Sequence, residues 1–212
     1  MKPLLIVKIV LWSLAVASVA GFVIVRTQAK PQPAPARPPV VAEPVSDELP
    51  TLIKMPAWSL TDQDGQAFTS DDLAGKPWVG FLFLTNCPTG ACPVMVGKMG
   101  DMQTALADTP VEIVSFSIDP DRDTPAVRKA YVEQVAGEGP GDKWHLVTGE
   151  SAEQMEQLAM DMKLAASRED WGHTTSFVLV DGAGFVRGIY GNTDPEAMTR
   201  LEADARRLAA EG

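Results

Sequence analysis

The feature that most limits the fold of this 212-residue chain is an alternation of short apolar runs with amphipathic stretches after residue 50. Residues 78–84 (WVGFLFL) and 111–118 (VEIVSFSI) are nearly continuous apolar runs of the length and composition of buried strands. Residues 177–180 and 185–190 form two further runs, joined by the turn sequence DGAG at 181–184, which predicts a hairpin. Strands alternating with helices and closed by a hairpin indicate an α/β layer fold.

Four positions carry residues with which helices commonly begin. Three are a capping-type residue followed by proline, whose missing N–H costs nothing at the first helical position. They are Cys92-Pro93, Thr124-Pro125 and Asp194-Pro195. The fourth is Ser151, with Gln154 three residues later as in a capping box. Ahead of these helices, residues 58–60 and 67–69 flank the sequence DQDG, so we expect an extra N-terminal hairpin.

The N-terminus predicts a membrane-spanning helix within residues 1–26. Residues 9–25 carry no charge, and with residues 3–7 the apolar stretch reaches the roughly 20 residues that a helical span requires. Lys8 lies near the helix end, where its long side chain can reach the headgroups. A cleaved signal peptide is the alternative, because the small residues 18–20 precede Gly21. The apolar run continues past that point, which favours an uncleaved anchor.

Residues 27–50 differ sharply in composition from what precedes and follows them. Seven prolines fall in this segment, which has few large apolar side chains. Proline favours the extended polyproline II conformation, so we expect a semi-rigid linker. Residues 51–212 then have the size of a single folded domain.

The net charge of −10 argues against a nucleic-acid partner. Proteins that bind phosphate backbones cluster lysine and arginine on one face, whereas the basic residues here are scattered along the chain. An acidic surface keeps a domain soluble and can also help it meet a cationic partner.

Cys87 and Cys92 are the only cysteines of the chain, and they lie where the strand at 78–84 gives way to a helix. If Cys92 caps that helix, the helix N-terminus stabilises its thiolate, the form that binds soft metals or attacks disulfides. A purely structural disulfide closes only a short loop and stabilises the fold by about 2 kcal/mol or less. The position of the pair therefore favours a functional role.

Three segments in this order resemble the Sco/SenC family of copper chaperones for cytochrome c oxidase. They are residues 85–93 (TNCPTGACP), 117–125 (SIDPDRDTP) and 172–181 (GHTTSFVLVD). The resemblance covers roughly residues 55–191 and implies a thioredoxin-like domain, with a central mixed sheet flanked by helices. It implies that Cys87, Cys92 and His173 bind a copper ion, Cu(I) or Cu(II), with Asp119 close to the site. The typical delivery target of the family is the dinuclear copper centre of oxidase subunit II.

The cysteine spacing departs from the family, which usually has three residues between its cysteines where this chain has four. In a continuous helix, five positions at about 100° each turn the two thiols away from each other. A shared metal therefore requires Cys87 to lie outside the helix. Gly90 makes this conformation accessible, because glycine adopts left-handed backbone angles at little cost.

The two histidines have different expected roles. His173 lies just before the strand at 177–180, at a strand end where sites in α/β sheets are commonly built. Two thiolates and an imidazole suit Cu(I), and residues 171–181 lack the proline characteristic of this loop in thioredoxin-like reductases. His145 is expected to be structural. Met95, Met99 and Met102 recur at helical spacing and are expected in the core.

Two functions stay open from the sequence. The first is a metallochaperone, more binding protein than enzyme, that delivers copper to oxidase subunit II or another copper-accepting protein. The second is a membrane-anchored thiol-disulfide oxidoreductase in which Cys87 or Cys92 attacks a partner disulfide. A peroxidase-like enzyme is the weaker third possibility. Because a reversible cysteine pair suits an oxidising compartment, we expect a single-pass inner-membrane protein whose domain faces the periplasm or an equivalent space.

Overall fold

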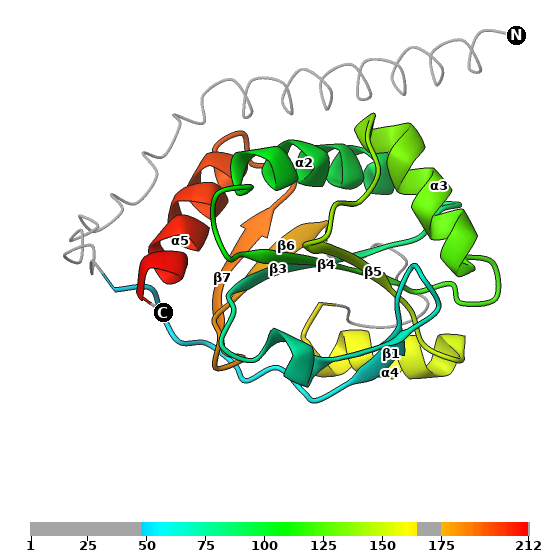
Figure 1. The fold of residues 1–212 in the computed structure, drawn as a ribbon, viewed down its shortest axis with the longest axis horizontal. Helices are drawn as coiled ribbons and strands as arrows, with labels where there is room; N and C mark the ends of the chain where they lie inside the picture. Colours follow the sequence, from blue (N-terminus) through cyan, green and yellow to red (C-terminus); the bar gives the residue numbers. More distant parts are fainter. Residues whose placement is uncertain (1–47, 165–174, 212) are drawn as a thin grey trace, which may run out of the picture. The chain divides into compact units, whose positions relative to one another are not determined.

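A five-stranded mixed sheet forms the centre of the computed structural model, which describes residues 48–164 and 175–211 (Figure 1). The strand order is β5 (Trp144–Val147), β4 (Glu112–Ser117), β3 (Trp78–Phe83), β6 (Ser176–Val180) and β7 (Val186–Gly191). β3, β4 and β5 run parallel, whereas β6 and β7 are antiparallel to their neighbours. The expected α/β fold with a central mixed sheet and a C-terminal hairpin is confirmed.

Helices and a small hairpin cover the two faces of this sheet (Figure 1). One face carries α2 (Ala91–Ala105), α3 (Pro125–Ala136) and α5 (Ala197–Glu211). The other carries α4 (Ala152–Asp161), the antiparallel hairpin of β1 (Ser59–Thr61) and β2 (Ala67–Thr69), and the short helix η1 (Ser70–Leu73). The hairpin expected before the main sheet is therefore present.

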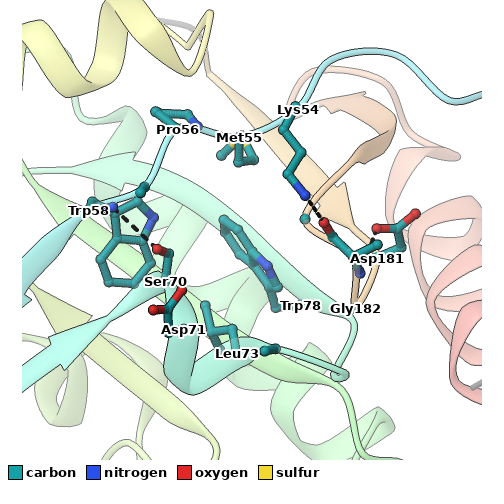
Figure 2. A pocket seen from close by; sticks show the side chains of 14 residues that line it. Lys54, Met55, Pro56, Trp58, Ser70, Asp71, Leu73, Trp78, Asp181 and Gly182 are labelled. Carbon is teal, nitrogen blue, oxygen red and sulfur yellow. Dashed lines mark hydrogen bonds between the residues drawn. The ribbon is translucent and has the colours of Figure 1, made fainter.

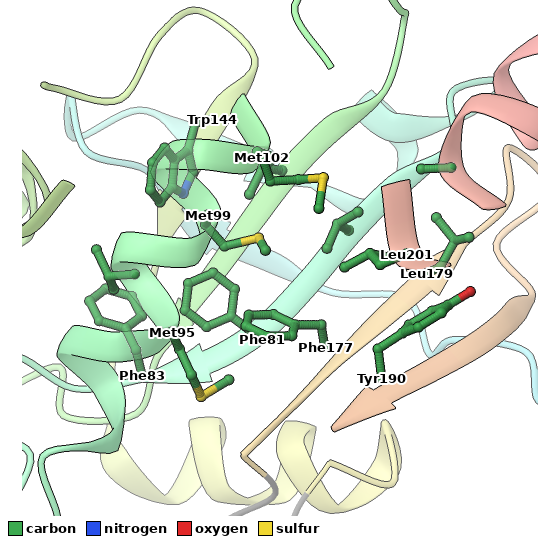
Figure 3. Close-up of a cluster of buried hydrophobic side chains, with 14 of the residues drawn as sticks. Phe81, Phe83, Met95, Met99, Met102, Trp144, Phe177, Leu179, Tyr190 and Leu201 are labelled. Carbon is green, nitrogen blue, oxygen red and sulfur yellow. The ribbon is translucent and has the colours of Figure 1, made fainter. Parts of the chain in front are cut away.

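The central strand is apolar throughout because both of its faces are covered. Successive side chains of a strand point to opposite faces. Phe81 and Phe83 accordingly pack with α2, α3 and α5, whereas Trp78 and Leu82 belong to the cluster under α4. Figure 3 shows Phe81 and Phe83 beside Met95 of α2. Burial of each such side chain stabilises the fold by about 1.5–3 kcal/mol.

Two of the expected helix starts are correct and two are displaced. Thr124 caps α3 by accepting a hydrogen bond from the Val127 amide, and Ser151 caps α4 by accepting one from the Gln154 amide. The expected starts at Cys92-Pro93 and Asp194-Pro195 are wrong by two residues, in opposite directions. α2 already begins at Ala91, whereas α5 begins only at Ala197, after a turn in which the Asp194 side chain accepts from the Glu196 amide.

β5, which contains His145, was not among the expected strands. Its four residues add a parallel edge strand beyond β4. His145 stacks on Phe68, with ring centroids 4.1 Å apart, and its Nε2 lies 3.1 Å from Glu112 Oε2. The structural role expected for this histidine is confirmed.

The three methionines of α2 are buried, as expected for core residues.

The expected anchor at residues 1–26 and the expected linker up to residue 47 lie outside the described residues. Within residues 48–164 and 175–211, we find no helix with the length and apolar character needed to cross a membrane. The described residues all fall within one compact unit, Ser46–Gly212.

Candidate metal centre

Three chain segments converge at one edge of the sheet. Because β3 and β4 are parallel, the loops that follow them leave at the same edge. β6 is antiparallel to β3, with Gly80 opposite Val178, so its first residue, Ser176, lies at that edge as well. Strand-end loops of α/β sheets are common binding sites. The cysteine segment follows β3 and the Asp-rich segment follows β4, so the sheet brings two of the three expected motifs together.

Asp123 joins the loops after β3 and β4. Its buried carboxylate accepts hydrogen bonds from the Thr85 amide (3.1 Å), the Thr85 hydroxyl and the Ser117 hydroxyl (2.6 Å). Behind it, the buried guanidinium of Arg128 donates to the Asp123 carbonyl oxygen at 2.7 Å. Arg128 also donates to the Leu146 carbonyl oxygen at 3.0 Å. Two hydrogen-bonded buried groups therefore fix the chain two residues before Cys87.

Cys87 lies in the loop before α2, whereas Cys92 lies in the first turn of the helix. Gly90 is the N-cap residue of α2 and has φ +72°, in the left-handed region. This angle turns the chain between the two cysteines, so Cys87 is free of the helix geometry that would separate the thiols. The expectation that Cys87 lies outside the helix, with Gly90 as the turning point, is confirmed.

Neither cysteine forms a disulfide, and each thiol affects the acidity of the other. Partial burial alone would raise the pKa of Cys87, but hydrogen bonds from Cys92 and from Thr89, whose hydroxyl lies 3.3 Å away, lower it to about 7. Burial raises the pKa of Cys92 to about 12, and its role as donor to Cys87 acts in the same direction. The idea that the helix N-terminus makes Cys92 the stabilised thiolate is therefore wrong: the more exposed Cys87 is the acidic thiol.

This asymmetry predicts the order in which the thiols react. In the reduced protein, iodoacetamide should label Cys87 at a rate that rises through about pH 7, as its thiolate forms. Cys92 should stay unlabelled well above that pH, because it is both buried and protonated. Peptide mapping after timed labelling measures both rates. Faster labelling of Cys92 than of Cys87 at neutral pH contradicts the assignment.

Of the other two expected site residues, Asp119 and His173, the structure describes only Asp119. Asp119 lies in the loop after β4, at the same edge as the cysteines, and its carboxylate is 3.6 Å from Arg122 Nε. His173 lies outside the described residues. Among the residues that the structure does describe, no three His, Cys, Asp or Glu side chains gather closely enough to hold a metal ion. The roles of all four residues in metal binding therefore stay predictions.

The donor set nevertheless fits a soft metal ion. Thiolates are the ligands that Cu(I) prefers, and the left-handed turn at Gly90 releases Cys87 from the helix geometry that would keep the two sulfurs apart. Cys87 has a pKa near neutrality and is the thiol more readily deprotonated. Cys92 keeps its proton until a cation replaces it, so metal binding at this pair releases protons.

A separate cavity of about 280 Å³ lies at the opposite end of β3 from the cysteines (Figure 2). It is bounded by Trp78, the first residue of β3, by Trp58 and by the hairpin turn at Gly182. Neither cysteine lines it. This cavity therefore contributes nothing to the chemistry of the cysteine pair.

Two residues beside the cysteines were not singled out in the sequence. Asp123 falls within the segment 117–125, but the sequence does not mark it as the carboxylate that accepts hydrogen bonds from Thr85 and Ser117. Tyr131 of α3 stacks on Phe83, with ring centroids 6.1 Å apart and planes at 15°. Its sequence position gives no sign that it lies near the cysteines, because the packing of α3 on the sheet decides this.

The sheet order, the flanking helices and a cysteine pair at the start of α2 define a thioredoxin-like domain with a candidate soft-metal site. Comparisons with known proteins identify the family within this class to which the chain belongs. The SCO1/SenC family model matches residues 47–208, and the chain therefore belongs to the SCO1/SenC family.

Individual relatives agree with this membership. The SCO1 protein homolog of Bacillus subtilis is 30% identical over 156 residues, which cover 70% of this chain and 79% of the relative. The structure of BsSco, described as a Sco-family cytochrome c oxidase assembly protein with a disulfide switch, matches with a TM-score of 0.68 and 26% identity; the match covers 78% of this chain and 99% of BsSco. ScoI of Bradyrhizobium japonicum, solved with copper bound, shares the fold with a TM-score of 0.59 and 24% identity, covering 74% of this chain and 99% of ScoI.

Proposed function

We propose that this protein binds copper through Cys87, Cys92 and His173 and delivers it to a copper-accepting protein during cytochrome c oxidase assembly. The observation that carries the proposal is the pair of free cysteines, one in the loop after β3 and one in the first turn of α2, in a SCO1/SenC domain. The B. japonicum relative that has this fold was solved with copper bound, and BsSco is described as an oxidase assembly protein.

The sheet topology supports His173 as the third ligand. Ser176 begins β6 at the edge where Cys87 and Cys92 lie, and His173 precedes it by three residues. Three residues of extended chain span at most about 10 Å, and this short separation supports the proposal that His173 serves the same site. An imidazole beside two thiolates gives a three-ligand site that suits Cu(I) and can also hold Cu(II).

We propose the dinuclear copper site of oxidase subunit II as the acceptor. A chaperone must release its ion, and oxidation of Cys87 and Cys92 to a disulfide removes both thiolates from the site. Forming the disulfide takes two electrons from the two sulfurs, so release by oxidation requires an external disulfide or another two-electron oxidant to accept them. Ligand exchange with acceptor thiolates needs no oxidant and keeps copper as Cu(I).

Copper transfer in vitro tests the delivery role. Protein loaded with Cu(I) is mixed with the purified copper-binding domain of subunit II, the two are separated, and the metal on each is measured. Transfer should be efficient for the parent and reduced for His173→Ala. His145→Ala is the matched control, because this second histidine lies on β5, at the end of the sheet away from the cysteines, and its replacement should leave transfer unchanged.

The same variants separate the chaperone from the thiol-disulfide oxidoreductase. The lowered pKa of Cys87 also suits a nucleophile that attacks a partner disulfide. If His173→Ala matches the parent in copper affinity and transfer, the ligand role of His173 fails. If neither protein transfers copper and both reduce a disulfide-bonded subunit II domain equally fast, the chaperone proposal fails and the oxidoreductase replaces it.

We further propose that residues 1–26 anchor the chain in the inner membrane and that residues 27–50 link the anchor to a domain in the periplasm or an equivalent oxidising space. The apolar run at 9–25 and the reversible cysteine pair support this topology. A reporter that is active only outside the cytoplasm should be active when fused at Gly212. Activity of a cytoplasm-specific reporter at this position contradicts the proposed topology.

A further inference from the structure

Cys87 lies in a surface loop whose two ends are held in different ways. The loop residues 86–90 are exposed, apart from Cys87 itself, which is half-buried. At the far end the chain enters α2, in which Cys92 is buried in the core. At the near end β3 stops at Phe83, and Thr85 already lies beyond the strand. The contacts of Thr85 therefore decide how firmly the near end of the loop is held.

Thr85 is bound through both its backbone and its side chain to one carboxylate. Its amide donates to Asp123 Oδ2 at 3.1 Å, and its hydroxyl donates to Asp123 Oδ1. Asp123 is fully buried, and its Oδ2 also accepts from the Ser117 hydroxyl at 2.6 Å. Hydrogen bonds to an ionised acceptor are stronger than those between neutral groups. The two loops that follow β3 and β4 are thus joined at Thr85.

Asp123 is fixed in turn by Arg128, a fully buried residue of α3. The guanidinium donates to the Asp123 carbonyl oxygen at 2.7 Å and to the Leu146 carbonyl oxygen of β5 at 3.0 Å. It also donates to the carbonyl oxygens of Thr61 (3.1 Å) and Asp62 (2.7 Å), at the end of β1. The network therefore fastens the loop after β3 to the backbone of the sheet and of the N-terminal hairpin.

This anchor restricts Cys87, which follows Thr85 by two residues. Two residues of extended chain span at most about 7 Å, so Cys87 can move only within that distance of a fixed point. A metal ion or a disulfide that joins Cys87 to Cys92 fixes the loop and costs conformational entropy. A loop that is already restrained loses less entropy in that step, which is the effect of preorganisation.

We propose that Thr85 is a positioning residue for the cysteine pair: its hydrogen bonds to Asp123 limit the positions open to Cys87 and so favour each step in which Cys87 and Cys92 act together. Thr85 acts through the backbone of the loop and supplies no ligand or nucleophile itself. The part of the proposal that concerns copper rests on the proposed function, whereas the part that concerns the two thiols does not.

Disulfide formation tests the positioning role without a metal. In a glutathione buffer, Cys87 and Cys92 give up two protons and two electrons as their sulfur–sulfur bond forms, and one oxidised glutathione is reduced to two glutathione molecules. The oxidised fraction of the protein gives the equilibrium constant. Thr85→Val removes the hydroxyl group and keeps the β-branched shape. It should lower the constant about 5-fold, because Cys87 gains freedom that the disulfide removes again.

Two further variants separate positioning from a general loss of stability. Thr85→Ser keeps the hydroxyl and should match the parent. Thr69→Val is the matched control, because the Thr69 amide and hydroxyl both donate to Asp72, at 2.8 and 2.7 Å. Thr69 directly precedes Ser70, which lines the cavity at the opposite end of β3 from the cysteines. Thr69→Val should therefore leave the glutathione equilibrium unchanged, whatever it does to the thermal midpoint.

Cu(I) affinity, measured by competition with a chromophoric chelator, gives the second readout. Thr85→Val should bind Cu(I) about 5-fold more weakly, and Thr85→Ser and Thr69→Val should match the parent. If the parent takes up no Cu(I), the proposed function fails on its own, and the glutathione equilibrium alone decides the role of Thr85. A parent-like equilibrium constant in Thr85→Val overturns the proposal. So does an equal shift in Thr69→Val, or a parent-like Cu(I) affinity of Thr85→Val when the parent binds the ion.

Discussion

Replacing either cysteine by serine is expected to abolish tight Cu(I) binding. Cys92→Ser removes the buried soft ligand and Cys87→Ser removes the more acidic one, and a neutral hydroxyl replaces neither. The loss in affinity should exceed the roughly 10- to 100-fold that follows removal of an outer hydrogen-bonding partner in metal sites. Chelator competition under reducing conditions measures the affinity of each variant.

Met95→Leu is the matched control for these cysteine variants. Met95 lies one helical turn after Cys92, is buried in the same apolar cluster, and carries the other kind of sulfur ligand that copper accepts. A volume-conserving swap of this type usually costs less than about 1.5 kcal/mol. Because Met95 is a core residue here, its replacement should leave Cu(I) affinity unchanged. Weakened binding in Met95→Leu, with parent-like binding in Cys92→Ser, contradicts the assignment of the sulfur ligands.

Asp123→Ala is expected to destabilise the fold more than any other single change near the cysteines. It leaves the Thr85 amide and the Thr85 and Ser117 hydroxyls without their acceptor, and it removes a carboxylate whose charge favours the charged form of the buried Arg128. Removing one partner from such a buried charged network typically costs about 3–5 kcal/mol. The free energy of unfolding from denaturant titration measures the effect.

Asp121→Ala provides the comparison for this carboxylate. Asp121 lies two residues earlier in the same loop but is exposed. Exposed substitutions usually change the free energy of unfolding by less than about 0.5 kcal/mol. Equal stability losses in Asp121→Ala and Asp123→Ala show that the carboxylate network does not hold the loop after β3. If only Asp123→Ala is destabilised, the network is responsible.

The apolar pattern was enough to predict the interior strands but not the edge of the sheet. β3 and β4 are covered on both faces, so their sequences are distinctive apolar runs. β5 is four residues long and has His145 in its middle, where the side chain pairs with Glu112 and stacks on Phe68. These contacts come from residues distant in sequence, and no local pattern reveals them.

Helix starts were predictable where a side chain does the capping. Thr124 and Ser151 accept the expected backbone hydrogen bonds. α2 begins instead at Ala91, two residues before Pro93, and its N-cap residue, Gly90, has a left-handed backbone angle and no side chain to cap the helix. Proline fits any position in the first turn of a helix, because the N–H groups of that turn have no intrahelical partner. Pro93 therefore does not fix the residue at which α2 begins.

The cysteine pair was predictable as a site, whereas its acid–base asymmetry was not. Spacing and the position between strand and helix indicate that Cys87 and Cys92 act together. Which thiol is acidic depends on burial, on the hydrogen bond between them and on Thr89, and these are properties of the folded loop. His173 and the N-terminal anchor lie outside the described residues and stay predictions.

Copper stoichiometry in two redox states tests the central claim most directly. The purified protein, with Cys87 and Cys92 either fully reduced or oxidised to a disulfide, is exposed to Cu(I), freed of excess metal and analysed for copper per chain. The reduced protein should hold close to one equivalent and the oxidised protein almost none, with binding restored on reduction. Equal copper uptake by the two forms contradicts a site built on these two thiolates.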